Sequence, residues 1–397
     1  MASPIEIVAR SSSVESTWAA SLPNYSVQIL KGARSVLPMQ QAIAELRERT
    51  GQTDNPLLRL DFFLGRVALF PANQPVVLLV RSPERLEAAV YLYEKTVLGL
   101  STGYMRCFDH LTGESSVIAP RPVRASMLKL AIHQLFIQTN ARVAWATVSQ
   151  GATGLSPGTR EEVDHVLLES STMNREHRLE LSDTFEATLS RFGQHTRRNL
   201  RYYRRRAEKD LNVEFHAVLT PQQSDEAFRQ LMGRSFQPFP VSLIEWRKMD
   251  GLLRTQPGYF AMGLRANAEW ISYLFGMRTE KHTYVLVQMN HKKFARYSLS
   301  TVLRSYFFEY EIDRGQSEIK FVNGTCALFQ RCCEPDTCLT VSARRGAAAF
   351  VISSWIAPWH SAPDHALNMP RWSGQTQSDS QALHMELPGF MPTQPKG

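Results

Sequence analysis

The sequence predicts an α/β protein of two halves, each a mixed, mostly antiparallel sheet flanked by helices. The chain has 397 residues, 43% of them hydrophobic, which is too long for one ordinary domain and apolar enough for two cores. Both halves contain short β-rich segments separated by turn residues, a pattern typical of antiparallel meanders. In both, a segment with helical apolar spacing follows and leads into a further strand.

The first half reads as a helix, a meander, a second helix and a returning strand. Leu37, Ile43 and Leu46 give residues 36–49 the spacing of a helix. Pro122 opens a second helix over residues 123–138, because proline suits the first helical turn. The strand candidates are residues 6–8, 25–30, 76–81, 86–93, 103–108 and 143–148. We therefore assign residues 1–150 to an N-terminal α/β half.

A boundary is expected in residues 151–176. The stretch 150–160 is rich in Gly, Ser, Thr and Pro, which favours a linker. It also contains the pattern G-x-S-x-G at residues 154–158. A hydrolase with that motif uses the backbone N–H after the serine as an oxyanion donor, and Pro157 has none. The motif therefore does not indicate a serine hydrolase.

The second half, residues 177–356, begins with a strand and a long helix. Apolar residues recur at steps of three and four from Leu181 to Ala207, which predicts one helix capped by Asp183, with Gly193 as a point of kinking. A helix over residues 300–314 ends at Gly315. The other helices are expected at 222–234 and 242–253, and the strands at 177–181, 213–219, 259–264, 270–277, 283–289 and 318–322. Residues 357–397 lack periodicity and are predicted to be disordered.

The charge of the chain favours polyanionic partners. Its formal net charge is +8, and eight Arg or Lys residues lie between Arg191 and Lys209. These side chains either form a solvated basic face or bind phosphates of a cofactor or an anionic acceptor, with Arg197, Arg201 and Arg204 as the substrate-binding candidates. Nucleic acid is not expected, since no established nucleic-acid module is present.

The cellular compartment and the redox state of the cysteines are inferred from signals that the sequence lacks. No stretch of about 20 apolar residues occurs, so no membrane-spanning helix is expected, although peripheral membrane contact stays open. The N-terminus lacks the features of a secretion signal, which favours a cytoplasmic protein. The five cysteines are then expected as thiols, and their spacing does not suit a zinc site, so no metal is predicted.

Two segments of the second half carry a family resemblance. Residues 181–210, LSDTFEATLSRFGQHTRRNLRYYRRRAEKD, resemble a helix in which an aromatic residue precedes arginines around a leucine. Residues 295–315, ARYSLSTVLRSYFFEYEIDRG, look like a helix start of the form Tyr-Ser-Pro-Gly-x-x-Leu, and a short strand with Asn323 and Gly324 follows. Together they resemble the GNAT-type acetyltransferase domain of polysaccharide- and cellulose-biosynthesis-associated acyltransferases, which is akin to the Fem-type aminoacyl transferases.

The resemblance implies two GNAT-like halves and an N-acyltransferase that uses acetyl-CoA or another acyl-CoA. The acceptor would be an amine of a small molecule or of a sugar or cell-envelope component, and the implied setting is polysaccharide biosynthesis. An acyl carrier protein is the alternative donor. The first turn of the helix at 300–314 suits a pyrophosphate, because its free amides and dipole favour anions. Ser298, Ser300 and Thr301 are the cofactor-binding candidates there, and Ser298 or Ser300 also suits the N-cap.

The reacting groups are expected where strands 283–289 and 318–322 diverge. Gln288, Tyr297 and Asn323 are the polar residues at that point and are the catalytic candidates. The sequence departs from the family at Leu299 and Ser300, where Pro-Gly is usual, at Lys320, near the usual strand Asp, and at Phe329-Gln330, where Tyr-Lys is usual. These departures leave open a non-catalytic binding or scaffold protein. The arginines between Arg197 and Arg206 leave open a basic adaptor for nucleic acid or membrane surfaces.

Overall fold

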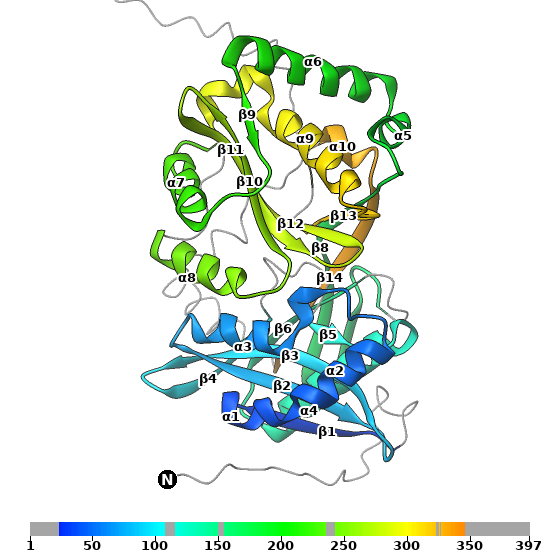
Figure 1. The fold of residues 1–397 in the computed structure, drawn as a ribbon. Coiled ribbons are helices and arrows are strands. Elements are labelled where there is room, and N and C mark those ends of the chain that lie inside the picture. The colour runs from blue at the N-terminus through cyan, green and yellow to red at the C-terminus, as the bar shows by residue number, and fades with distance from the viewer. Residues whose placement is uncertain are drawn as a thin grey trace, which may run out of the picture.

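The strands of both halves join into one sheet in the computed structural model, which describes residues 24–107, 116–149, 155–235, 243–322, 325 and 327–345. Most neighbouring strands are antiparallel, and helices cover the sheet on both sides (Figure 1). The predicted α/β class is confirmed. The strand candidate at 6–8 and the tail at 357–397 lie outside the described residues, and the domain boundaries stay predictions.

The N-terminal half contains the predicted meander. Strands β1 to β4 pair consecutively and antiparallel, and β6 then pairs with β4 in parallel. The strands are β1 (Ser26–Lys31), β2 (Asn73–Arg81), β3 (Leu86–Val97), β4 (Leu100–Arg106), β5 (Val117–Ile118) and β6 (Val143–Ser149). The helices are α1 (Ala33–Val36), η1 (Leu37–Met39), α2 (Gln40–Arg49), η2 (Pro56–Leu58), α3 (Leu60–Ala68), η3 (Arg121–Val123) and α4 (Arg124–Gln138). The helix expected over 36–49 is thus α2, preceded by a 3₁₀ turn that contains Pro38.

The C-terminal half repeats this order of elements. Strands β9 to β12 pair antiparallel, and β13 pairs with β12 in parallel. The strands are β9 (Glu214–His216), β10 (Tyr259–Ala266), β11 (Glu269–Arg278), β12 (His282–Asn290) and β13 (Glu318–Phe321). The helices are α5 (Phe185–Ser190), α6 (Gln194–Leu211), α7 (Pro221–Leu231), α8 (Leu243–Arg254), η4 (Lys292–Tyr297), α9 (Leu299–Asp313) and α10 (Ala327–Gln330).

Two long strands join the halves, one of them starting within the expected linker. β7 (Arg160–Val163) and β8 (Val166–Glu180) occupy most of residues 151–176, and residues 150–154 lie outside the described part. β8 pairs with β13 near its end, and β14 (Glu334–Arg345) lies between β8 and β6. The sequence did not predict these strands because only Val166 and Leu168 give β8 an apolar alternation before the sequence turns polar. The boundary expected in residues 151–176 stays a prediction.

The helix expected from Asp183 onward is two helices. α5 ends at Ser190 and α6 starts after Gly193, whose ψ of 150° breaks the helix. Thr184 caps α5 in place of Asp183, since its hydroxyl accepts the N–H of Ala187 at 3.1 Å. Both helices contact α9 and bury their apolar residues in the same core, so the apolar spacing continues across the break.

The core of the C-terminal half lies on both faces of its sheet. One cluster packs β10 to β13 against α6 and α9, and the other packs the sheet against α7 and α8. Leu57 and Phe62 of the N-terminal half belong to the second cluster. Figure 1 accordingly places α3 next to α8, with α6 and α9 on the other side of the sheet.

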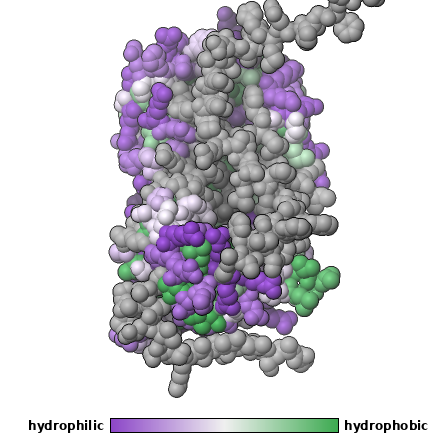
Figure 2. All heavy atoms as spheres, turned by 180° about the vertical axis from the view of Figure 1, so that it is seen from behind, coloured by the Kyte–Doolittle hydropathy of each residue, from purple (hydrophilic) through white to green (hydrophobic). Residues whose placement is uncertain are grey.

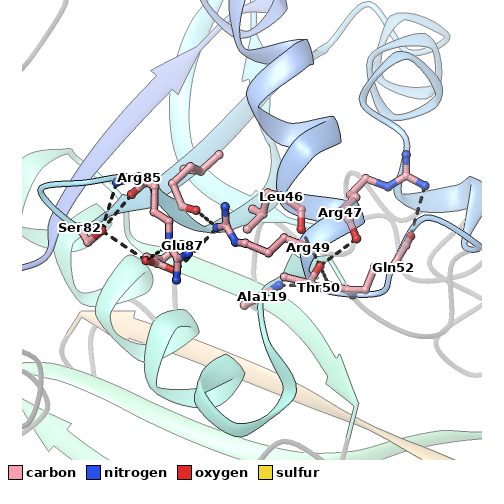
Figure 3. Close-up of polar contacts among 10 residues, drawn as sticks. Leu46, Arg47, Arg49, Thr50, Gln52, Ser82, Arg85, Glu87 and Ala119 are labelled. Carbon is pink, nitrogen blue, oxygen red and sulfur yellow. Dashed lines mark hydrogen bonds and ion pairs between the residues drawn. The ribbon is translucent and has the colours of Figure 1, made fainter.

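The loop after α2 forms part of this contact between the halves. Arg47 donates from Nη2 to the carbonyls of Thr53 at 2.9 Å and Asn55 at 2.8 Å. The Gln52 side chain accepts the N–H of Ala119 at 3.2 Å, and Figure 3 shows it beside the end of α2. The carbonyl of Asp54 accepts the hydroxyl of Tyr284 on β12 at 3.0 Å. The N-terminal half thus supports the strand from which the candidate site is built.

Candidate active site

The candidate site lies where β12 and β13 stop pairing. Their parallel register runs from His282 and Glu318 to Val285 and Phe321. The last backbone bond joins the N–H of Val322 to the carbonyl of Val285, at 3.1 Å. Among the described residues, no strand pairs with β12 on this side beyond that point. The divergence expected from the sequence is therefore present.

A β-bulge marks the same point on the other edge of β12. Phe275 of β11 pairs with Val287, but the next residue, Gly276, pairs with Val285, so Leu286 is the extra residue. The extra residue exchanges the two faces of the strand. Val285 packs in the cluster under α9, whereas Leu286 and Met289 pack in the cluster under α7. The bulge therefore directs Gln288 toward α9.

Gln288 connects β12 with the first two turns of α9. Its Nε2 lies 3.4 Å from the carbonyl oxygen of Ser300 and from Oδ1 of Asn290. Its Oε1 accepts a hydrogen bond from Nε of Arg304 at 2.9 Å. Two predicted site residues, Gln288 and Ser300, are thus brought together.

Arg304 was not among the residues expected in the site. Its side chain is 3% exposed, and its guanidinium lies 4.8 Å from the ring centroid of Phe321 and 5.0 Å from that of Phe329. It also donates to the hydroxyl of Thr325. A signal existed in the sequence, because Arg304 is the only basic residue of α9, whose remaining residues are largely apolar. A cation buried beside a candidate catalytic amide raises the local positive potential.

Residues at the N-terminus of α9 contact one another through their hydroxyl groups. Ser298 stands at the N-cap in the left-handed region, with φ 49° and ψ 55°, and its hydroxyl makes no capping bond. That hydroxyl instead lies 2.9 Å from Oγ1 of Thr301, which is 2% exposed. Ser300 is partly exposed. Of the three cofactor-binding candidates, Thr301 is therefore buried under Ser298.

Tyr297 is held by two arginines. It is 2% exposed, and its hydroxyl accepts from Nη2 of Arg296 at 2.8 Å. The guanidinium of Arg206, on α6, lies 5.2 Å from the ring centroid. Tyr297 therefore joins α6 to the loop before α9. The third catalytic candidate, Asn323, lies outside the described residues.

The predicted substrate-binding arginines contact other helices. Arg201 forms an ion pair with Glu186 of α5, and Arg197 donates to the carbonyl of Ser190 at 3.0 Å. Arg204 pairs with Glu208 at 3.1 Å and with Glu309 of α9 at 2.7 Å. These partners lie on the α6 side of α9, whereas Arg304 faces β12. The structure thus does not bring the arginines together with Gln288.

Arg204 also makes a cation–π contact with a tyrosine of α9. Its guanidinium lies 3.9 Å from the ring centroid of Tyr306. Burial raises the pKa of Tyr306 to about 12, and a hydrogen bond from its hydroxyl to Glu208 acts in the same direction. Tyr306 is therefore a neutral phenol at physiological pH and a structural contact between α6 and α9.

A buried histidine ends β12. His291 is 5% exposed, and its Nδ1 accepts the N–H of Lys293 at 3.1 Å, which caps η4. Its Nε2 lies 3.4 Å from Glu269, which also pairs with Arg234 at 3.0 Å. Burial lowers the pKa of His291 below its ordinary value. Glu269 is the first residue of β11. The described residues contain no cluster of metal-ligating side chains.

The N-terminal half contains an equivalent parallel strand pair, but another strand fills the space beside it. β4 and β6 pair in parallel at residues 104–106 and 143–145. There β5 fills the space beside β3, pairing Ile118 with Ala89. The N–H of Ser116 donates to the carbonyl of Thr147 on β6 at 3.2 Å. The carbonyl of Ser116 accepts the N–H of Tyr91 on β3 at 2.8 Å. Among the described residues, only the C-terminal pair diverges without an intervening strand.

Comparison with known proteins identifies the domain that carries this geometry. Residues 194–329 match the family model described as the acetyltransferase (GNAT) domain. The match begins with α6 and ends in α10, and it therefore includes β12, α9 and β13. This part of the chain is thus similar to a GNAT acetyltransferase domain, in line with the resemblance. No curated protein matches the chain in sequence.

Several solved structures resemble the chain at low identity. A tandem GNAT protein from the clavulanic acid biosynthesis pathway is 13% identical, with a TM-score of 0.49, over 81% of this chain and 99% of that one. FemX is 9% identical, with a TM-score of 0.49, over 72% and 87% of the two chains. The C-terminal domain of a putative lysylphosphatidylglycerol synthetase from Agrobacterium fabrum is 12% identical, with a TM-score of 0.46, over 79% and 96%.

Proposed function

We propose that the protein is an N-acyltransferase that moves an acyl group from acyl-CoA to an amine. The observation that carries this proposal is the divergence of β12 and β13 inside the matched domain, with α9 starting directly after the β12 loop. A strand edge without a partner presents backbone N–H groups that can bind an extended ligand. The N-terminal first turn of α9 would bind the phosphates of the acyl-CoA.

The proposed reaction needs little from the side chains. The amine nitrogen attacks the thioester carbonyl, the C–N bond forms, the C–S bond breaks, and the amine proton ends on the thiolate sulfur. Backbone N–H groups of β12 past Leu286 would polarise the carbonyl. Gln288, Tyr297 and Asn323 remain our catalytic candidates, with Gln288 fixed by Arg304 at 2.9 Å.

The donor end is assigned to the start of α9. Ser300 is the accessible hydroxyl there, and Ser298 would act together with Thr301, to which it is bonded at 2.9 Å. An acyl carrier protein remains the alternative donor. These assignments rest on the partial exposure of Ser300 and on the positive end of a 15-residue helix.

The acceptor is proposed to be the amine of a small molecule or of a sugar or cell-envelope component. The association with polysaccharide biosynthesis and a cytoplasmic location belong to this proposal. Arg197, Arg201 and Arg204 could serve an anionic acceptor only by exchanging their present partners, such as Glu186 and Glu309. No described helix is long and apolar enough to cross a membrane.

Thermal unfolding with acetyl-CoA, longer acyl-CoAs and free CoA tests the proposal. A ligand that binds the folded chain at 100 times its Kd stabilises it by about 2.7 kcal/mol. We expect stabilisation that Ser300→Glu removes, because a negative charge at the start of α9 repels phosphate. Ser156→Glu, which changes an exposed serine of the segment before β7, is the matched control and should keep the shift. No shift with any donor would favour a carrier-protein donor or the non-catalytic alternative.

A further inference from the structure

The hairpin between β3 and β4 exposes three apolar side chains at and beside its turn. Leu98 is 97% exposed, Leu100 72% and Val97 44%. Figure 1 shows this hairpin projecting from the edge of the N-terminal half, and Figure 2 shows an apolar projection there from behind. The hydrophobic effect favours the burial of large apolar side chains. Three exposed apolar neighbours at a loop tip therefore indicate a contact surface.

The backbone of this turn makes the leucine more unusual. β3 ends at Val97 and β4 begins at Leu100, which pair with each other, so Leu98 and Gly99 form a two-residue turn. Both have positive φ, 51° and 77°. Such turns favour Asn-Gly or Asp-Gly, and a leucine in the left-handed region is strained. The sequence thus carries both backbone strain and apolar exposure at Leu98, a local conflict typical of functional positions.

The surroundings of the hairpin are basic. Arg142 donates its backbone N–H to the carbonyl of Gly103 on β4 at 2.8 Å, and its own carbonyl accepts the N–H of Arg345 at 3.2 Å. Both arginines are exposed, and neither has a carboxylate partner among the described residues. Ile137, 54% exposed, adds apolar surface next to Phe136, whose carbonyl accepts a side-chain bond from Arg345.

β4, α4 and β6 contain no acidic residue. Residues 62–83, 95–108 and 115–160 contain no Asp or Glu. Glu94, at the base of the hairpin, is fully buried and paired with Lys31 at 3.0 Å. A projecting apolar tip beside two exposed arginines is complementary to an anionic surface. The nearby carboxylates at the end of β14, Asp164 and Glu169, pair with His133 and Arg344.

We propose that the β3–β4 hairpin inserts into the interface of an anionic lipid bilayer, with Leu98 and Leu100 among the acyl chains and Arg142 and Arg345 at the headgroups. A convex tip of three side chains is far smaller than the roughly 800 Å² per partner of a stable protein interface. Partition into a bilayer requires no matching groove and combines apolar burial with attraction to anionic lipid. The proposal stands independently of acyl transfer.

Vesicle co-sedimentation of the full chain tests this proposal. Vesicles of phosphatidylcholine alone are compared with vesicles of equal parts phosphatidylcholine and phosphatidylglycerol, at low and high salt. Binding is expected to the anionic vesicles, at least about tenfold weaker to the neutral ones, and weakened by salt. The double variant Arg142→Gln, Arg345→Gln should lose most of this anionic preference.

Leu98→Asn is the decisive variant, because asparagine suits the turn and the chain should unfold at the same or a higher temperature. It should bind anionic vesicles about tenfold more weakly than the wild type. Val218→Asn, which changes a 71% exposed valine of the other half, should bind normally. Equal binding by Leu98→Asn, or no binding by the wild type, would overturn the proposal. So would a dimer in light scattering that Leu98→Asn dissociates, since the tip would then contact a second copy.

Discussion

Arg304 of α9 donates from Nε to Oε1 of Gln288 on β12 at 2.9 Å, across the point where β12 and β13 separate. The bond joins a buried cation to the side chain that the sequence nominated for catalysis. Gln288 also lies 3.4 Å from the carbonyl of Ser300, so it connects the strand with the first two turns of the helix. Its effect on folding must therefore be separated from any effect on chemistry.

Replacing Gln288 by Ala and by Glu separates these effects. Gln288→Ala removes the acceptor of a buried N–H and should lower the free energy of unfolding by about 1–3 kcal/mol in urea. Gln288→Glu keeps an oxygen acceptor and adds a charge opposite to that of Arg304, so it should be as stable as the wild type. If Gln288 acts directly on the substrate, Gln288→Glu should fold but lose acyl transfer. An Ala variant as stable as the wild type would contradict the structural role.

The local parts of this fold follow from sequence. The three strands at 259–289 are β-rich runs joined by short polar turns, so composition and turn chemistry predicted them within a few residues. The helix that ends at Gly315 was predicted from its apolar pattern and glycine C-cap. The divergence of the strand pair was expected from the family resemblance.

The features of the structure that depend on contacts between residues far apart in the chain could not be predicted from the sequence. β14 was not predicted, because its partners β6 and β8 lie far earlier in the chain and alternation alone does not name a partner. The burial of Arg304 depends on Gln288, Phe321 and Phe329, which only the folded chain brings together. Similarly, the ion pairs of Arg201 and Arg204 reduce the case for a phosphate site that the charge pattern alone had raised.

The bulge of β12 depends on a glycine in the facing strand. A Cβ on Gly276 would lie 1.9 Å from the carbonyl oxygen of Tyr284 and 2.9 Å from the ring of Phe260. Backbone cannot move away at small cost, so Gly276→Ala should push β12 from β11 and lower the free energy of unfolding by about 1–3 kcal/mol. Urea denaturation measures this loss.

The matched control for that change is Gly251→Ala. Gly251 lies in α8, and a Cβ added there would meet no neighbouring atom within 4 Å. Alanine favours a helix interior, so this variant should be unchanged or more stable by about 0.5–1 kcal/mol. Acyl transfer should fall only in Gly276→Ala, since only there does β12 shift. Equal stability of the two variants would show that the bulge tolerates a side chain.

His291 should make folding stability depend on pH. Burial lowers its pKa in the folded chain, and the nearby cations Arg234, Lys292 and Lys293 act in the same direction. The unfolded chain therefore takes up the proton first as the pH falls. The stability contributed by His291 is fully present above the ordinary pKa of 6.5 and is lost as the pH falls through the folded value.

His291→Asn removes this titration and keeps a capping oxygen for the N–H of Lys293. We expect the wild type to lose more free energy of unfolding than this variant between about pH 7.5 and pH 5.5, and the two to differ by less than about 1 kcal/mol at the upper limit. His195→Asn changes an exposed histidine of α6 and should leave the pH profile of the wild type unaltered. Parallel profiles for the wild type and His291→Asn would mean that His291 takes up its proton equally in both states, against the burial that the structure gives it.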